Sequence, residues 1–336
     1  MKAAIMEGPK QFVIKDLPKP SPGQSEVIVR TRACAVCGSD LTVYKLGIPD
    51  RILGHEFSGD IVELGDGVKD WKTGDRVVIE PQLSCGECHW CQTKQFNLCD
   101  SLEYTGLATD GGFAEFVRVP AYQLHRLPDN ISYEQGALME PLAVAIRGVR
   151  LSQIKPGDCV AVFGCGSIGL FTMLWARKMS AKKIIALDVV TARAEKARQL
   201  ADNILNPAEI TASEEIIKLT NNIGADVIFE CSGNSQAQQE AIESVRKGGQ
   251  IVLLGIGYEP APIMFMQLTM KEIGLKGSLG YSSSSDDSEF LTAINTVASG
   301  DIDITRVPST TFNLDSIGKA FEQSLHGDVA KAIVLI

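Results

Sequence analysis

The sequence predicts an α/β protein of two domains, a β-rich domain followed by a doubly wound parallel sheet. Three observations favour this fold class. A chain of 336 residues exceeds what one hydrophobic core usually serves. Short apolar runs bounded by Gly and Pro fill the first third of the chain, and strand-like and helix-like segments alternate after residue 155.

Composition narrows the range of possible partners. The net charge is -9, and no basic run is present that could neutralise phosphates, which argues against nucleic acid or an anionic membrane surface. Glu7 and Pro9 interrupt any signal-peptide core, and no apolar run approaches the roughly 18 residues of a membrane span. We therefore expect a cytoplasmic protein that acts on a small molecule.

The first domain begins with short β-strands. Residues 2–6, 12–14 and 27–35 are apolar runs separated by turn signals, as in an antiparallel sheet. Residues 38–46 resemble a helix that ends at Gly47. Further strands are predicted between residues 59 and 80 and over residues 111–119, which together indicate a barrel-like β domain. Residues 133–151 are expected to be helical, with a break at Pro141.

Cys37, His55 and Glu56 offer a thiolate, an imidazole and a carboxylate, a donor set that suits zinc. Three protein ligands leave a fourth position open, as a catalytic metal requires. Ser39 could take the proton of an alcohol bound there. Cys34 and Cys37 also form Cys-x-x-Cys, so a redox dithiol or half of a zinc knuckle is an alternative.

Four more cysteines are closely spaced in a glycine-containing polar stretch, Cys85, Cys88, Cys91 and Cys99. Their spacing lets four thiolates surround one structural zinc ion and leaves no vacant position for chemistry. Two disulfides, or His89 in place of one cysteine, are the alternatives. A further candidate, Glu140, lies in an apolar run, where a buried carboxylate needs a partner. This partner is either the catalytic metal or the backbone N–H groups at a helix start.

The second domain opens with an apolar strand followed by Gly164-x-Gly166-x-x-Gly169 and a helix, the order that a dinucleotide site requires. Ser167 and Ile168 complete this turn, where the helix N-terminus favours pyrophosphate. The next strand ends in Asp188, which could accept both ribose hydroxyls and repel a 2′-phosphate. Arg193 could instead meet a phosphate, but we interpret it as covering the adenine and ribose. The cofactor is therefore predicted to be NAD.

Strands and helices continue to alternate to residue 278, which predicts a Rossmann-type parallel sheet. Cofactor is expected at loops that follow two strands, although ordinary turn chemistry explains them equally well; these residues are Cys231, Ser232, Leu254, Gly255 and Ile256. Segments near residues 306–312, 314–324 and 332–336 are expected to return to the first domain. The predicted division is therefore residues 1–147 with 285–336, and residues 148–284.

In this order, the motifs Cys37-Gly-Ser-Asp40, Gly54-His-Glu56, the four cysteines, Gly111-Gly-Phe-Ala-Glu115, Glu140-Pro141 and the glycine turn resemble the medium-chain zinc-dependent alcohol dehydrogenases. The resemblance covers essentially the whole chain and is closest to the polyol, butanediol and threonine dehydrogenase branch. It implies a GroES-like catalytic domain, Cys37, His55 and Glu56 as zinc ligands, and Glu140 as an alternating or water-bridged fourth. It also implies a homodimer or homotetramer.

The implied activity is hydride transfer between a secondary alcohol or its ketone and NAD. Two departures from the branch bear on it: Thr42 stands where a proton-relaying histidine is common, and Gly280 replaces an arginine of sorbitol-type members. Tyr44 and Tyr281 are candidate substrate contacts, and packing within the domain is the alternative for Tyr44. A zinc-free quinone or enoyl reductase on the same fold, and a silent NAD-binding or zinc-binding protein, are the rival functions.

Overall fold

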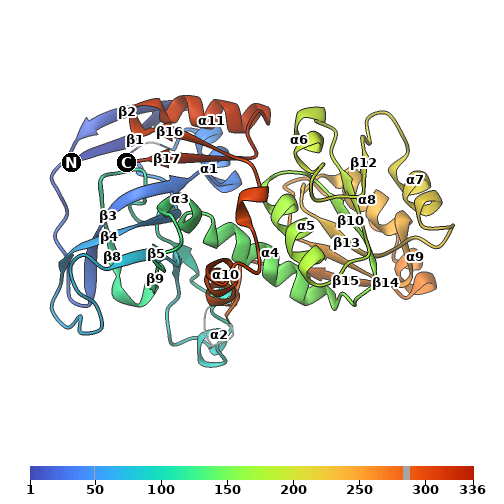
Figure 1. Cartoon of the computed structure of the whole chain (residues 1–336), viewed down its shortest axis with the longest axis horizontal. Coiled ribbons are helices and arrows are strands. Elements are labelled where there is room, and N and C mark those ends of the chain that lie inside the picture. Colours follow the sequence, from blue (N-terminus) through green and yellow to red (C-terminus); the bar gives the residue numbers. More distant parts are fainter. Residues whose placement is uncertain (49, 283–287) are drawn as a thin grey trace. The chain divides into compact units, whose positions relative to one another are not determined.

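The computed structural model describes residues 1–48, 50–282 and 288–336 and divides into two compact units (Figure 1). Unit 1 comprises Met1–Glu140, Ser282–Thr305 and Ser309–Ile336, and unit 2 comprises Pro141–Tyr281 and Arg306–Pro308. The domain boundary predicted between residues 284 and 285 lies outside the described residues. Across the described ranges, no helix has both the length and the apolar character needed to cross a membrane.

Unit 1 is built on a seven-stranded sheet with the order β16-β17-β3-β4-β5-β9, in which β8 also pairs with β3. Strand β3 is bordered by β4 along its length and by β17 and β8 on its other edge, and its apolar side chains are fully buried. The strands are β1 (Lys2–Gly8), β2 (Gln11–Asp16), β3 (Glu26–Ala35), β4 (Glu56–Leu64), β5 (Arg76–Ile79), β6 (Gln82–Leu83), β7 (Glu103–Tyr104), β8 (Phe116–Pro120), β9 (Leu124–Arg126), β16 (Ser309–Asn313) and β17 (Lys331–Leu335).

Helices and short 3-10 turns complete unit 1. They are α1 (Gly38–Leu46), α2 (His89–Gln92), η1 (Phe96–Leu98), η2 (Ala121–Gln123), α3 (Tyr133–Gly136), α10 (Glu289–Ala298), η4 (Leu314–Ser316) and α11 (Ile317–His326), while α4 (Met139–Ser152) and η3 (Ile304–Arg306) link the two units along the chain. The expected return of the C-terminal segments to the first sheet is confirmed by the pairing of β17 with β3.

The helix predicted over residues 133–151 differs from the one observed. It is two helices, α3 and α4, and the interruption falls between Gly136 and Met139 rather than at Pro141. Pro141 is the third residue of α4, and a proline in the first turn of a helix sacrifices no hydrogen bond because those N–H groups have no partner within the helix. The proline therefore begins a helix here instead of breaking one.

Unit 2 is a six-stranded parallel sheet with the order β12-β11-β10-β13-β14-β15, which confirms the predicted doubly wound α/β class. Its helices alternate with its strands along the chain (Figure 1). The elements are β10 (Cys159–Phe163), α5 (Ser167–Lys178), β11 (Lys183–Leu187), α6 (Thr191–Lys196), β12 (Asn203–Leu205), α7 (Ala212–Leu219), β13 (Ala225–Glu230), α8 (Ser235–Ser244), β14 (Val245–Leu253), α9 (Phe265–Lys271) and β15 (Gly274–Gly277).

Candidate active site

Cys37 stands between the end of β3 and the first residue of α1. Its backbone N–H donates to Asp40 Oδ2 at 2.9 Å, so the carboxylate at the third position of the helix satisfies a group that the helix itself cannot. Gly47 ends α1 with a left-handed φ of 70°, and a Cβ there would lie 2.2 Å from Pro9 N. Local geometry therefore defines both ends of α1, and Cys37 is held at its start.

His55 and Glu56 are brought to Cys37 by the pairing of β3 with β4. Glu56 lies opposite Ala35 in the register of these strands. Gly54, just before them, has a φ of 100°, and a Cβ there would lie 2.6 Å from Cys34 Sγ, so a side chain would be both strained and obstructed. Ligand atoms of Cys37, His55 and Glu56 all lie within 4.8 Å of one another, close enough for one metal ion to contact all three.

Asp40 also orients His55. Its Oδ1 lies 3.4 Å from His55 Nδ1, and both side chains are buried. Burial alone would lower the pKa of His55, but the charges of Asp40 and Cys37 raise it well above its usual value in the metal-free protein. A carboxylate beside Nδ1 leaves the other ring nitrogen for a metal, which is the usual arrangement around a ligating histidine.

Lys331 is a further charged residue of this cluster that the sequence analysis missed. Its Nζ lies 2.7 Å from Glu56 Oε1 and also contacts Oε2, with both side chains buried. Burial lowers the pKa of Lys331, but Glu56 and Cys37 outweigh it and raise that pKa above its usual value. No local spacing could have revealed the pair, because the two residues are 275 positions apart and meet through the sheet.

Glu140 lies at the second position of α4 and is buried, but its oxygens do not belong to the group of ligand atoms within 4.8 Å of one another. Burial, followed by the charge of Glu56, raises the pKa of Glu140 to about 7. The carboxyl group is thus close enough to the cluster to be influenced by it. Its ligation of a metal stays a prediction.

Three other residues considered in the sequence analysis differ in their exposure to solvent. Ser39 is the second residue of α1 and is partly exposed, two positions from Cys37. Cys34 is fully buried, and burial raises its pKa well above the usual value, which argues against a reactive dithiol with Cys37. Tyr281 is fully buried, and its contact with substrate stays a prediction.

The substrate contact predicted for Tyr44 is wrong in this structure. The ring lies in the core of unit 1, stacked on Phe12 with centroids 5.2 Å apart and packed against Phe321. Its hydroxyl donates to the Lys10 carbonyl at 2.9 Å and lies 3.2 Å from Glu322 Oε1. The ring is buried and its hydroxyl is hydrogen-bonded, so Tyr44 packs α1 against α11 and does not line a pocket.

The four cysteines of residues 85–99 converge without a hydrophobic core of their own. Their sulfur atoms lie within 4.8 Å of one another, with 3.6 Å between Cys88 and Cys91 and 3.9 Å between Cys85 and Cys91. A tetrahedron with Zn–S bonds of about 2.3 Å requires about 3.8 Å between sulfurs. All four are free thiols, and His89 is not part of the group, so the arrangement fits a zinc site made of four cysteines.

Backbone N–H groups favour the thiolate form in this lobe. Those of Glu87 and Cys88 lower the pKa of Cys85 to about 6, and the Cys88 N–H donates to Cys85 Sγ at 3.4 Å. Cys91 is buried, and burial raises its pKa to about 12 in the metal-free protein. A cation that binds all four sulfurs would make Cys85 and Cys91 alike in protonation, because a coordinating thiol is deprotonated.

The glycine turn of unit 2 has the geometry of a pyrophosphate cradle. Gly164 has a φ of 95°, and a Cβ on Gly169 would lie 1.9 Å from the Gly164 carbonyl oxygen. A Cβ on Gly166, the residue that caps α5, would meet no atom within 4 Å, so space beside the N-terminus of α5 is open. The three glycines thus permit a tight turn, a close approach of pyrophosphate to the backbone and close packing of the helix on the strand, as the motif requires.

Asp188 follows β11 beside this turn. Its Oδ2 accepts the Cys165 N–H and its Oδ1 accepts the Val190 N–H, both at 2.8 Å. Each oxygen keeps a second lone pair for a hydroxyl donor. Ser167 and Ile168 begin α5, and Arg193 lies in α6 with a partly exposed side chain.

Glu230, which the sequence analysis missed, organises the two loops predicted to meet the cofactor. The carboxylate of Glu230 accepts the N–H groups of Ser232 at 2.8 Å and Gly233 at 3.0 Å, and its carbonyl accepts those of Leu254 and Gly255. The loops that follow β13 and β14 are thus joined. Cys231 Sγ lies 4.0 Å from Thr172 Oγ1, and Ile256 is 68% exposed.

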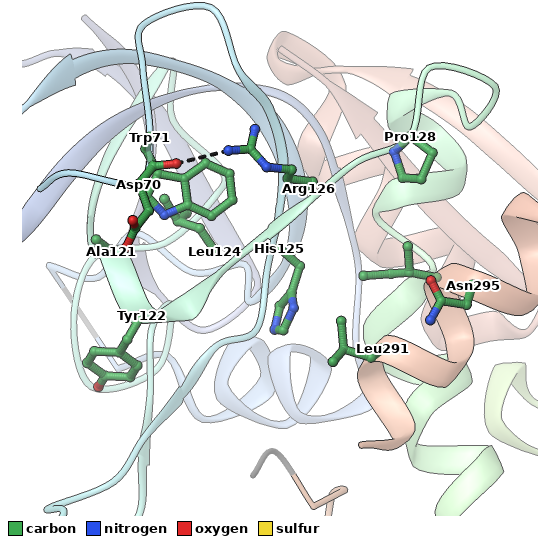
Figure 2. Close-up of a pocket in the computed structure, with 11 residues that line it drawn as sticks. Asp70, Trp71, Ala121, Tyr122, Leu124, His125, Arg126, Pro128, Leu291 and Asn295 are labelled. Atoms are coloured by element: carbon green, nitrogen blue, oxygen red, sulfur yellow. Dashed lines mark hydrogen bonds between the residues drawn. The ribbon is translucent and has the colours of Figure 1, made fainter. Parts of the chain in front are cut away.

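A separate cavity of about 560 Å³ lies in unit 1 between β9 and α10 (Figure 2). His125, one of its lining residues, pairs with Glu80 at 2.6 Å, and the guanidinium of Arg126 lies 4.6 Å from the ring centroid of Trp71. None of the residues predicted for metal, cofactor or substrate lines this cavity, so it is not part of the candidate active site.

Comparison with known proteins agrees with this geometry. The alcohol dehydrogenase GroES-like domain matches residues 23–129, and the zinc-binding dehydrogenase family matches residues 167–299. Sorbitol dehydrogenase of Bacillus subtilis (strain 168) is 34% identical over 337 residues, which cover 97% of this chain and 94% of that protein.

Two solved structures are similar over the whole chain. That of 2R,3R-butanediol dehydrogenase from Bacillus subtilis is 33% identical with a TM-score of 0.89, covering 100% of this chain and 99% of the other. A zinc-binding dehydrogenase from Sinorhizobium meliloti 1021 bound to NADP is 31% identical with a TM-score of 0.91 and the same coverage. The chain therefore belongs to the zinc-dependent medium-chain alcohol dehydrogenases and is an oxidoreductase, as its motifs predict.

Proposed function

We propose that the protein is an NAD-dependent dehydrogenase for secondary alcohols of the vicinal diol, polyol or sugar acid type. The convergence of Cys37, His55 and Glu56 within 4.8 Å carries the proposal, because a sulfur, a nitrogen and an oxygen donor suit zinc and leave one position open. The names of the similar proteins, sorbitol and butanediol dehydrogenase, support the substrate class.

In this proposal, Cys37, His55 and Glu56 hold the catalytic zinc, with Glu140 as an alternating fourth ligand. Zinc bound there acts as a Lewis acid that lowers the pKa of the substrate hydroxyl. Asp40 keeps the His55 ring in position, and Lys331 balances the charge of Glu56. The second zinc, on Cys85, Cys88, Cys91 and Cys99, stabilises its lobe.

Ser39 is the proposed first acceptor of the hydroxyl proton, which its hydroxyl can pass on because it both donates and accepts. Thr42 lies one turn further along α1 and donates to the Gly38 carbonyl at 3.3 Å. The proton then has to reach solvent through water at the exposed start of α1. Tyr281 is kept as a proposed substrate contact.

The preference for NAD over NADP is supported by Asp188. A carboxylate that accepts ribose hydroxyls repels the 2′-phosphate of NADP, and the buried position of Asp188 weakens screening by salt. We assign the cofactor to the glycine turn and to the loops joined by Glu230, within residues 148–284, and the catalytic domain to residues 1–147 and 285–336.

A homodimer or homotetramer formed through unit 2 is also proposed. Strand β15 is one edge of the parallel sheet, and helix α9, which packs on the adjoining strand β14, exposes Phe265, Met266 and Met270, each by at least 65%. An apolar helix beside an open strand edge fits a second copy of the chain. Sedimentation of the wild-type protein and of Met270→Glu tests this assembly.

A substrate screen tests the central proposal. Zinc-loaded protein is assayed with diols, polyols, sugar acids and threonine, each with NAD and NADP, and the zinc content is measured. We expect NADH formation with at least one vicinal diol or polyol and two zinc ions per chain. A metal content near zero with reduction of quinones or enones would support the zinc-free reductase. Tight NADH binding without turnover on any alcohol would support a silent binding protein.

A further inference from the structure

The carboxylate that the proposed function gives to zinc already has a cation partner. Lys331 Nζ contacts both oxygens of Glu56, and the side chains are 2% and 0% exposed. A partner this well shielded from water is held by electrostatic attraction that salt screens only weakly. Lys331 is therefore a fixed neighbour of the metal cluster, unlike a surface lysine.

The backbone determines where this ammonium group lies. Strand β17 pairs with β3 so that Ile333 lies opposite Ala35, and the Val36 N–H donates to the Ala332 carbonyl at 2.9 Å. Ala35 in turn lies opposite Glu56 on the other side of β3. Lys331 thus reaches across the end of β3 toward Glu56, and the register of the sheet places its backbone there.

A divalent ion in this cluster would lie close to the Lys331 ammonium. The two cations repel each other, and they compete for the charge of the same carboxylate. Without Lys331, the metal-free protein would instead hold an uncompensated buried carboxylate, which is strongly destabilising. Both effects act in the same direction, because the lysine stabilises the metal-free state and disfavours the metal-bound one.

We infer that Lys331 is a positioning residue that holds Glu56 as its counter-ion in the metal-free site, so that zinc must compete with the lysine and exchanges more readily than it otherwise would. The inference rests on the proposed function, since it requires Glu56 to bind zinc. It predicts that removing the charge of residue 331 makes zinc harder to remove and the metal-free protein less stable.

The test compares Lys331→Met and Lys331→Arg with the wild-type protein. Zinc release to an excess of a colorimetric chelator is followed over time, and the release phase that is absent from Cys37→Ser is assigned to the Cys37 cluster. We expect release from Lys331→Met to be about tenfold slower or more. Replacing partners of metal ligands changes metal affinity by about tenfold to a hundredfold, and the change here should favour the metal because the lost group repels it. Lys331→Arg should release zinc at close to the wild-type rate because it keeps the charge.

Thermal unfolding of the metal-free proteins is the second readout. Metal-free Lys331→Met should unfold at a lower temperature than the metal-free wild-type protein, and added zinc should raise its unfolding temperature by more. In Lys183→Met, added zinc should raise the unfolding temperature by the same amount as in the wild-type protein. Lys183 is a suitable control because it donates to the Leu219 carbonyl within unit 2, to which no proposed metal ligand belongs. If Lys331→Met does not fold, Lys331→Gln, which lacks the charge but keeps a donor, carries the same expectation.

The outcomes separate the inference from the proposed function. If Cys37→Ser binds as much zinc as wild type, the proposed catalytic site is wrong. If Cys37→Ser loses one zinc but Lys331→Met releases zinc as fast as the wild-type protein, the site is supported and the role of Lys331 is wrong. Faster release from Lys331→Met would also overturn the inference, because it would show that the lysine helps to retain the metal.

Discussion

The two cysteine-containing clusters of unit 1 assemble in opposite ways. The four-cysteine lobe draws all its ligands from 15 consecutive residues in a loop that is partly exposed. The Cys37 cluster gathers its residues from the end of β3, the start of β4 and, through Lys331, from β17. The second also has three buried charged residues around it that are not proposed as principal ligands, Asp40, Glu140 and Lys331.

This difference separates a metal that builds structure from one that performs chemistry. A closed set of four thiolates needs no further support, because the metal itself supplies the energy that holds the loop. A site with an open position must keep its ligands in place when that position changes, and surrounding charges do this. The predictions below follow from the comparison, and the largest expected effect comes first.

Replacing Cys37 by Ser should abolish turnover with little loss of stability. The variant should lose one zinc and at least about a thousandfold in kcat/KM, because a Lewis acid contributes several kcal/mol to such a reaction. NADH should still bind, since its proposed site lies in unit 2. Zinc content, steady-state kinetics and NADH fluorescence check this. Retained turnover in the zinc-depleted variant would contradict the catalytic assignment.

Replacing Cys91 by Ser should instead reduce stability. The lobe lacks its own core, so losing the metal that folds it should lower the Tm by about 5 °C or more. Calorimetry of the two cysteine variants side by side makes the contrast direct. An unchanged Tm with one zinc lost would show that the four-cysteine lobe does not depend on its metal.

Replacing Asp40 by Asn should weaken zinc binding at the Cys37 cluster by about tenfold to a hundredfold, because the residue beside His55 Nδ1 loses its charge. The matched variant Asp75→Asn, whose carboxylate accepts from Lys72 and Arg126 elsewhere in unit 1, should leave this affinity unchanged. Competition with a chelator of known affinity provides the measurement. Equal effects from the two variants would mean that Asp40 acts only on overall stability.

Glu230 is a buried carboxylate outside the metal sites, and we expect its replacement to have the smallest effect. Glu230→Gln should weaken NADH binding by about fivefold, because the hydrogen bonds to Ser232 and Gly233 lose the charge of their acceptor. Burial raises the pKa of Glu230 above that of an unfolded glutamate, although Ser232 and Gly233 oppose this.

The sign of the pH effect follows from that shift. Between the two pKa values the folded protein binds more protons than the unfolded chain, so Glu230 makes stability fall as pH rises through this interval. Thermal unfolding from about pH 4 to pH 7 should therefore show that the stability of the wild-type protein relative to Glu230→Gln falls as pH rises. A relative stability that rises with pH would contradict the assigned direction.

The sequence allowed prediction of what depends on neighbouring residues or on well-known motifs. The spacing of the four cysteines, the glycine turn and the Cys37, His55 and Glu56 motifs all carry their signal locally. Lys331 could not be found in this way, since its partner is defined by sheet register. Glu230 was missed although Ser232 and Gly233 are close to it in sequence, because a glutamate at the end of an apolar strand has no spacing that marks it as their acceptor. For Tyr44 the sequence left substrate contact and packing both open, because an aromatic residue near a ligand cannot be placed on one face of a short helix from sequence alone, and the structure shows packing.

The register of β17 against β3 has a consequence for biosynthesis. Cys37, His55 and Glu56 are made long before residues 331–335, so the emerging chain carries a soft ligand set without its later cationic neighbour. Unit 1 can close its sheet only when β17 is added beside β3. During synthesis there is thus an interval in which Cys37, His55 and Glu56 have been made and Lys331 has not.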